Sequence, residues 1–218
     1  MDPFFEIPEP VTRVEPDPPP EPPWAGPPED VLAALVPERH ILWQTDRLTV
    51  MLSHVDAFPT GALFHLRMVA QRTSDMLDDE WHRIHETVFD HGESRTGTTL
   101  PDEFFRVGVG FADGRRVTNI GWGVGAWSVR RGQSPKPPSL VEIRSGGSGS
   151  NRSISARKKE WLWPLPPPER FDLVIEWPAL GVPVTRAAID GAAIVTAAEN
   201  VVPLWSTGAE PWTVNGEP

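Results

Sequence analysis

One stretch of the sequence concentrates side chains that can bind a metal ion. The segment WHRIHETVFDH carries His82, His85, Glu86 and His91. Imidazole and carboxylate groups are common zinc ligands, and a spacing of three or four residues places two of them on one face of a helix. The HExxH pattern of zinc-dependent hydrolases is incomplete, because Phe89 stands where its second histidine would be. The segment therefore predicts either a hydrolase metal site at His82, His85 and His91 or, as the preferred interpretation, a solvated helix surface.

A second polar pair lies earlier in the chain. His54 and Asp56 are two positions apart in an expected strand, so their side chains share one face of a sheet. Two residues alone specify no reaction. The pair is interpreted by default as neighbouring polar groups on the surface.

Tryptophans form a third group that could bind a ligand. Residues 161–181 read WLWPLPPPERFDLVIEWPALG, in which Trp161 and Trp163 face the same side of an expected strand. Proline donates no hydrogen bond to a sheet, so residues 164–168 are expected to join two strands. Exposed tryptophans can stack on sugar rings or proline-rich peptides, whereas burial of a large aromatic stabilises by about 2–3 kcal/mol. Core packing is preferred, and the sequence leaves open whether Leu162 or the tryptophan pair is exposed.

Basic residues gather around a glycine- and serine-rich stretch. They are Arg144, Arg152, Arg157, Lys158 and Lys159. Such a cluster could hold a phosphate-bearing ligand or attract the acidic N-terminal part of the same chain, although a solvated strand face is the more common explanation.

Several kinds of catalytic motif are absent from the sequence. It has no cysteine, which excludes disulfides, thiolate metal sites and cysteine nucleophiles. The glycines of VGVGFADG and GWGVG do not form GxGxxG, and no GxSxG, P-loop or kinase motif occurs. No cofactor and no catalytic residue is predicted on these grounds.

Alternating apolar and polar residues predict that the chain is mainly β. In FFRVGVGF, Phe105, Val107 and Val109 lie on one face, and Asp113-Gly114 then signals a hairpin. Many short strands separated by turns indicate an antiparallel β-sandwich, immunoglobulin-like or jelly-roll-like, with one or two short helices. Strands are expected at 47–55, 61–71, 104–111, 115–120, 122–130, 140–144, 153–163, 171–177 and 182–189.

Two helices are expected within this β pattern. Residues 76–91 place Leu77, Trp81, Ile84 and Val88 on one apolar stripe. The second helix, 192–202 with Asp190 as its cap, is preferred over a tight hairpin at the same place. Residues 145–153, SGGSGSNRS, are expected to form a flexible loop.

The N-terminal part of the chain differs sharply in composition from the rest. Residues 1–37 hold 12 of the 26 prolines, and residues 1–40 hold nine acidic and two basic residues, a net charge of −7 out of −10. Such a segment cannot build a packed core. The predicted organisation is a disordered tail at 1–40, a single domain at 41–205 and a flexible end at 206–218.

Charge and hydropathy limit the possible partners. No run of 18 apolar residues could span a membrane, no secretory signal is recognisable at the start, and the absence of cysteine suits a cytoplasmic location. Nucleic acid is not expected as a partner, because the chain has no overall excess of Lys and Arg. The oligomeric state is not indicated.

The strings DEFFRVGVGFADGRR and WLWPLPPPERFDLVIEWPALGVPVTRAAIDG resemble those of a family of uncharacterised actinobacterial proteins. The resemblance covers roughly residues 41–205 and implies a bacterial, cytoplasmic protein. It implies no activity, cofactor or catalytic residue.

Together these features predict a non-enzymatic binding or assembly module that acts through protein–protein contacts. The alternatives are a metal-dependent or carboxylate hydrolase that uses the helix histidines with Glu86, and a carbohydrate-binding sandwich that uses Trp161 and Trp163. The expected contact residues are Trp161, Trp163, Arg157, Lys158 and Lys159.

Overall fold

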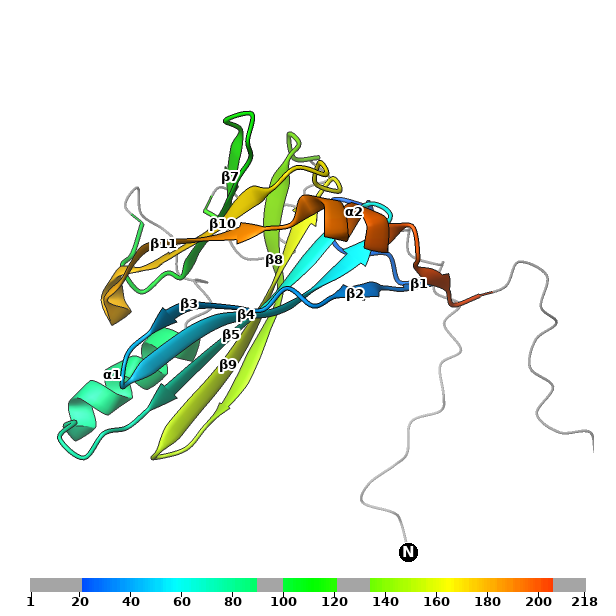
Figure 1. Ribbon diagram of the computed structural model, residues 1–218. Coiled ribbons are helices and arrows are strands. Elements are labelled where there is room, and N and C mark those ends of the chain that lie inside the picture. The colour runs from blue at the N-terminus through cyan, green and yellow to red at the C-terminus, as the bar shows by residue number, and fades with distance from the viewer. Residues whose placement is uncertain (1–20, 90–99, 121–133, 206–218) are drawn as a thin grey trace, which may run out of the picture.

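The protein is a β-sandwich in which a larger antiparallel sheet packs on a smaller one (Figure 1). The computed structural model describes residues 21–89, 100–120 and 134–205. The larger sheet contains β2 (Ala34–Val36), β3 (His40–Gln44), β4 (Leu48–Phe58), β5 (Gly61–Gln71), β8 (Ser139–Gly149) and β9 (Ser153–Trp163). Its order is β2-β4-β5-β9-β8, and β3 also pairs with β4. The prediction of a mainly β, antiparallel sandwich is confirmed.

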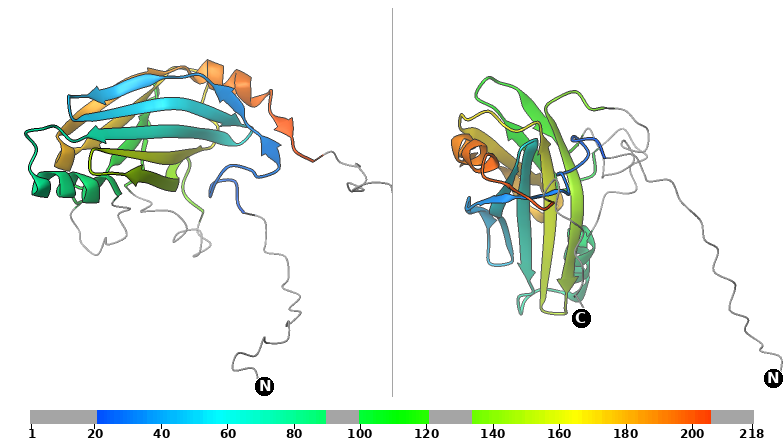
Figure 2. Two further views of the ribbon diagram at one scale, coloured as in Figure 1. Left: turned by 90° about the horizontal axis from the view of Figure 1, so that it is seen from below. Right: turned by 90° about the vertical axis from the view of Figure 1, so that its right-hand side faces the viewer.

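The smaller sheet has the order β11-β10-β6-β7. Its strands are β6 (Arg106–Gly110), β7 (Arg116–Thr118), β10 (Phe171–Trp177) and β11 (Val182–Ile189), and the short helix η3 (Pro178–Leu180) joins the last two. A two-stranded sheet, β1 (Val31–Leu32) with β12 (Val202–Pro203), brings the two ends of the described chain together. Seen from below, the larger sheet lies in front of the smaller one (Figure 2, left).

The core lies between the two sheets, as the alternation predicts. Phe64, Leu66 and Met68 of β5 point inward, and so do Leu173 and Ile175 of β10. All five side chains are almost completely buried, and each contributes about 1.5–3 kcal/mol through removal of apolar surface from water.

Two helices complete the cover of this core, α1 (Asp78–Phe89) and α2 (Gly191–Ala198). Trp81 and Val88 of α1 are buried, but Leu77 precedes the helix and its exposed fraction is 73%, so the predicted stripe is shorter than expected. In α2 the Asp190 carboxylate accepts hydrogen bonds from the amides of Ala192 and Ala193. The helix rather than the hairpin therefore follows Asp190.

The glycine-rich stretch 145–153 is not a loop throughout, which corrects the expectation. β8 continues to Gly149 and pairs with β9 as far as Ile154. A Cβ atom at Gly147 would lie 2.8 Å from Phe89 of α1, and one at Gly149 would lie 2.8 Å from His85. The glycines therefore allow α1 to pack closely on the strand and do not form a flexible linker.

The predicted tail boundary at residue 41 also needs correction. Residues 31–36 contain β1 and β2, and Trp24 is buried. These residues find partners because β2 pairs with β4 and β1 pairs with β12, contacts that local composition does not reveal. The folded region therefore includes part of the predicted tail. Residues 1–20 of that tail, the strand expected at 122–130 and the C-terminal end from residue 206 lie outside the described residues.

Candidate functional site

A bulge in β4 decides which side chains reach the outer face of the larger sheet. Before it, Leu48, Val50 and Leu52 point inward at alternate positions. The pairing with β5 then shifts, so that Leu52 lies opposite Leu66 and His54 lies opposite His65, with one residue unpaired. The extra residue reverses the alternation, which turns His54 and Asp56 outward. Without it, His54 would point into the core, and bulges often redirect side chains in this way beside functional sites.

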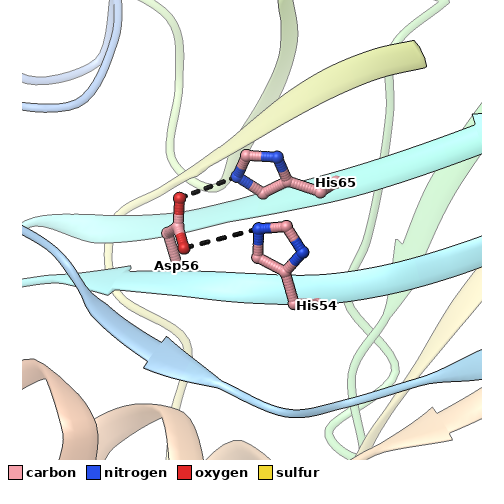
Figure 3. A group of neighbouring side chains, drawn as sticks. All are labelled: His54, Asp56 and His65. Carbon is pink, nitrogen blue, oxygen red and sulfur yellow. Dashed lines mark hydrogen bonds and ion pairs between the residues drawn. The ribbon is translucent and has the colours of Figure 1, made fainter.

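His54, Asp56 and His65 form a compact polar group on this outer face (Figure 3). The two imidazole rings are stacked, with centroids 3.9 Å apart and planes inclined by 20°. His65 Nε2 donates a hydrogen bond to Asp56 Oδ2 at 2.7 Å, and His54 Nε2 lies 3.7 Å from Asp56 Oδ1. Both rings therefore turn one nitrogen toward the same carboxylate.

The surroundings favour neutral imidazole at His54 and ionised carboxylate at Asp56. Partial burial lowers the pKa of His54, and repulsion from His65 lowers it further. Burial alone would raise the pKa of Asp56, but the hydrogen bond from His65 and the nearby charges of His65, His54 and Lys159 lower it overall. His54 and Asp56 thus favour the forms whose nitrogen and oxygen atoms can accept a hydrogen bond.

A row of cations continues from this group across the sheet. Arg67 of β5 lies directly opposite Arg157 of β9, and Lys159 of β9 lies opposite Arg144 of β8. Cross-strand partners share a face, and Lys159 is also the cross-strand partner of His65. Within the described chain, no carboxylate forms an ion pair with any of these four cations. We call Arg67, Arg144, Arg157 and Lys159 the basic row.

The basic row borders an open hollow of about 410 Å³ at the edge of the sheet. Arg144, Arg157 and Lys159 line it, and Gly146 stands opposite Arg157, where no side chain fills the space. β8 is the last strand of the sheet, so the hollow opens beside a sheet edge.

Apolar side chains flank the other side of the histidine–aspartate group. Leu35 of β2 lies opposite Asp56, and Ile41 of β3 lies opposite Met51. Their exposed fractions are 62% and 64%. The outer face therefore passes from apolar to polar to basic across the sheet.

Lys158 does not belong to this basic surface, which corrects the predicted cluster. It lies opposite Leu66 and therefore points toward the core. It is buried, and its Nζ donates to both Glu142 carboxylate oxygens at 3.3 and 3.1 Å. Neighbouring residues of a strand face opposite sides, so Arg157 and Lys159 share the outer face and Lys158 cannot.

The tryptophans do not form an exposed platform. Trp161 and Leu162 are both completely buried, because both faces of the sheet are covered at this point. Trp161 packs with Phe58 and Leu63, and its Nε1 donates to the carbonyl of Pro23 at 3.0 Å. The segment that contains Pro23 covers the outer face here. Trp161 is therefore unable to stack on a sugar, and the partly buried Trp163 packs against the same cluster.

In the described part of the chain, neither His82 nor His85 belongs to a group of three potential metal ligands. His82 is exposed and pairs with Glu86 at 3.1 Å, one turn along α1. His85 lies against Phe89, with ring centroids 4.8 Å apart, and covers Gly149. His91 lies outside the described residues.

A hollow of about 1080 Å³ in the described part of the chain lies between α1, the turn that follows β3, and η3. One of its charged residues, Arg47, donates to Glu80 at 2.8 Å and to Asp75 at 2.7 Å. These two bonds anchor α1 and the residues just before it to the turn between β3 and β4.

Sequence reasoning grouped His54 with Asp56 but missed His65 and Arg67. Both lie in β5 among apolar residues, and only their places opposite β4 and β9 join them to the site. The period of two in GALFHLRMVAQ already places His65 and Arg67 on the polar face of that strand. What the sequence did not reveal was the pairing register between β4 and β5, which is shifted by the bulge in β4.

No protein-family model, curated protein or solved structure matches this chain. The resemblance to an actinobacterial family therefore remains a prediction from the two quoted strings. No helix in residues 21–89, 100–120 and 134–205 is both long and apolar enough to cross a membrane.

Proposed function

We propose that the protein is a non-enzymatic binding module that takes an acidic segment of a partner protein on the outer face of its larger sheet. The observation that carries the proposal is the basic row. Its four cations stand as two like-charged cross-strand pairs, and none of them forms an ion pair with a carboxylate of the described residues.

This arrangement reduces the stability of the isolated chain. Residues directly opposite each other in an antiparallel pair have Cβ atoms about 4.5–5.5 Å apart, and like charges at that distance repel. A bound chain of carboxylates removes the repulsion and adds charge-assisted hydrogen bonds, since guanidinium groups bind carboxylates in a two-pronged geometry. Partner binding is therefore the function that gives these paired charges a physical role.

The extent of the surface favours a protein segment over a small ligand. The row spans β5, β9 and β8, and on the far side of the histidine–aspartate group the same face carries exposed Leu35 and Ile41. An extended acidic segment with an apolar end matches this order of side chains across the strands. Binding in this form gains speed and specificity mainly from charge complementarity.

The test is the binding of a fluorescent peptide of alternating Glu and Ser residues to the full chain, followed by anisotropy. We expect anisotropy to rise with protein concentration and the affinity to fall as salt is added, because salt screens exposed charges. The variant Arg157→Glu, which reverses one charge of the basic row, should lose most of the binding. The matched control Arg116→Glu reverses an exposed charge on β7 of the smaller sheet and should bind as the parent does.

Four results would count against the proposal. Equal loss in the control variant would show that only net charge matters. Absence of peptide binding would remove the acidic partner, and inorganic phosphate bound at the row without the peptide would assign the surface to a phosphate-bearing ligand. Binding of the peptide only after removal of residues 1–20 would instead identify the chain's own acidic N-terminus as the occupant.

A further inference from the structure

The histidine–aspartate group contains the donor atoms of a metal site. His54, Asp56 and His65 each offer one ligand atom, and these three atoms all lie within 4.8 Å of one another. Two imidazoles and one carboxylate form a common ligand set for zinc and related divalent transition metals, with further positions left for water. Within the described residues, no other group of three such side chains converges in this way.

The distances show how far the side chains must move to accept an ion. Zinc binds nitrogen and oxygen at about 2.0–2.2 Å, so neighbouring ligand atoms of a tetrahedral site stand about 3.3 Å apart. The contacts between the histidine nitrogens and the Asp56 oxygens are 2.7 Å for His65 and 3.7 Å for His54, on either side of that value. These contacts involve different oxygens of Asp56, and the three ligand atoms lie within 4.8 Å of one another, so an adjustment of up to about 1.5 Å brings them to the tetrahedral spacing. In that state the ion replaces the proton that His65 donates to Asp56.

The sheet holds the three residues next to one another. His54 and Asp56 are fixed by the bulge in β4, and His65 lies directly across on β5, which pairs with β4 along nearly its whole length. The two rings are stacked and nearly parallel, so each must turn about its side-chain bonds before both in-plane lone pairs can point at one ion. Sites built on strands are held more precisely than sites on loops, which reduces the free energy needed to assemble the ligands.

The group is also reachable by an ion from solution. The side chains are only partly buried, with exposed fractions of 30% for His54, 23% for Asp56 and 16% for His65. Burial is therefore sufficient to exclude part of the water around the donors while an approach from the outer face stays open. Lys159 lies beside the group, and its charge opposes a cation, so the affinity is expected to be moderate.

We infer that His54, Asp56 and His65 bind one divalent transition-metal ion of the zinc class on the outer face of the larger sheet. The inference departs from the sequence-based expectation that the protein needs no cofactor and that any metal would lie on the helix histidines. It does not depend on the proposed acidic partner, because different side chains carry it.

The experiment is a titration of the metal-free full chain with Co²⁺, followed by the visible absorption that a nitrogen- and oxygen-ligated cobalt ion gives, with Zn²⁺ as competitor. We expect a single equivalent of Co²⁺ to bind and Zn²⁺ to displace it. Loss of a residue that only hydrogen-bonds a metal ligand weakens binding by about 10- to 100-fold. His65→Ala removes a ligand itself and should therefore weaken Co²⁺ binding by more than this.

Asp56→Asn provides a second variant that keeps the size of the side chain, in case His65→Ala disturbs the fold. It should lose affinity comparably while its circular dichroism stays that of the parent. His82→Ala is the control, since His82 is an exposed histidine on α1 away from the group. It should leave the titration unchanged.

Failure of the parent protein to bind Co²⁺ or Zn²⁺ at a single site would overturn the inference and leave the group as an ion pair on the sheet. Binding that His82→Ala abolishes and His65→Ala spares would move the site to α1. Peptide anisotropy measured on His65→Ala distinguishes the two proposals, because the basic row is intact in that variant.

Discussion

Glu160 is a carboxyl group in surroundings that disfavour its ionised form. It lies on the inner face of β9, completely buried, opposite Glu142 of β8. Asn119 Nδ2 donates to its Oε1 at 3.1 Å, while its Oε2 is buried without a hydrogen-bond partner among the described residues. Burial, together with the charge of Glu142, raises the pKa of Glu160 to about 8. Glu160 therefore holds a proton at neutral pH in the folded protein.

This raised pKa predicts that stability falls as the pH rises. Folded Glu160 retains its proton up to about pH 8, whereas its ordinary pKa is 4.5, so the folded state binds more protons between these values. The contribution is complete below about pH 4.5, and it is lost as the pH rises through 8. Glu160→Gln, which cannot ionise, should flatten this part of the profile. Urea denaturation at pH 5.5, 7 and 8.5 measures the change.

The control for this prediction is Glu86→Gln, an exposed carboxylate on α1 that should keep the slope of the parent. A Glu160→Gln profile as steep as that of the parent would place the pH dependence in another group.

At the scale of elements, α2 shows how a short helix is specified by its first residues. The Asp190 carboxylate accepts from the amides of Ala192 at 3.0 Å and Ala193 at 3.3 Å, which satisfies two donors that an eight-residue helix cannot pair internally. Gly191 follows because a Cβ atom there would lie 2.4 Å from the Pro167 carbonyl oxygen. The cap and the glycine together seat α2 against the chain that leads into β10.

Loss of this cap should destabilise the protein without altering the rest of the fold. We expect Asp190→Ala to reduce the free energy of unfolding by about 0.5–2 kcal/mol, the usual effect of removing an N-cap. Asp190→Asn retains an acceptor oxygen and should stay close to the parent. Chemical denaturation of the three proteins decides the matter, and equal stability of Asp190→Ala and the parent would show that the cap contributes nothing.

At the scale of the whole molecule, the segment from Pro23 to Ala33 covers one end of the outer face of the larger sheet. Val31 and Ala33 pack against Phe58, Leu63 and Trp161, and this second apolar cluster is separate from the main core. The larger sheet is thus buried on both faces at this end and open farther along, where the histidine–aspartate group and the basic row lie. The proposed binding surface therefore begins where this N-terminal segment no longer covers the sheet.

Substitution of Trp161 tests whether the N-terminal segment buries this end of the outer face. Trp161→Ala should lower the free energy of unfolding by about 3–5 kcal/mol, because it empties a buried site whose ring also contacts Phe58 edge-on. Trp163→Ala should cost less, since Trp163 is only partly buried. Thermal and urea unfolding give the comparison. An unchanged free energy of unfolding in Trp161→Ala would contradict the buried position of this side chain.

Much of the fold was predictable because strand burial repeats every two residues. The alternation in FDLVIEW and FFRVGVGF identified β10 and β6, and the period of α1 was recognisable despite the exposed Leu77. Such patterns depend only on neighbours in the chain. The same reasoning erred where another element decided the outcome, as at Gly147, whose lack of a side chain accommodates Phe89 and does not mark a loop.

The sequence by itself determined the class of the protein: a cysteine-free, mainly β chain with two short helices and an acidic, proline-rich beginning. These properties follow from composition and local period. Only the tertiary structure decided which polar side chains meet. The register across β4 and β5 includes a bulge that no local pattern reveals, and one unpaired residue there turns His54 and Asp56 from the core toward His65. Likewise, whether Trp161 is exposed depended on a segment more than a hundred residues away, because burial is a property of the packed chain.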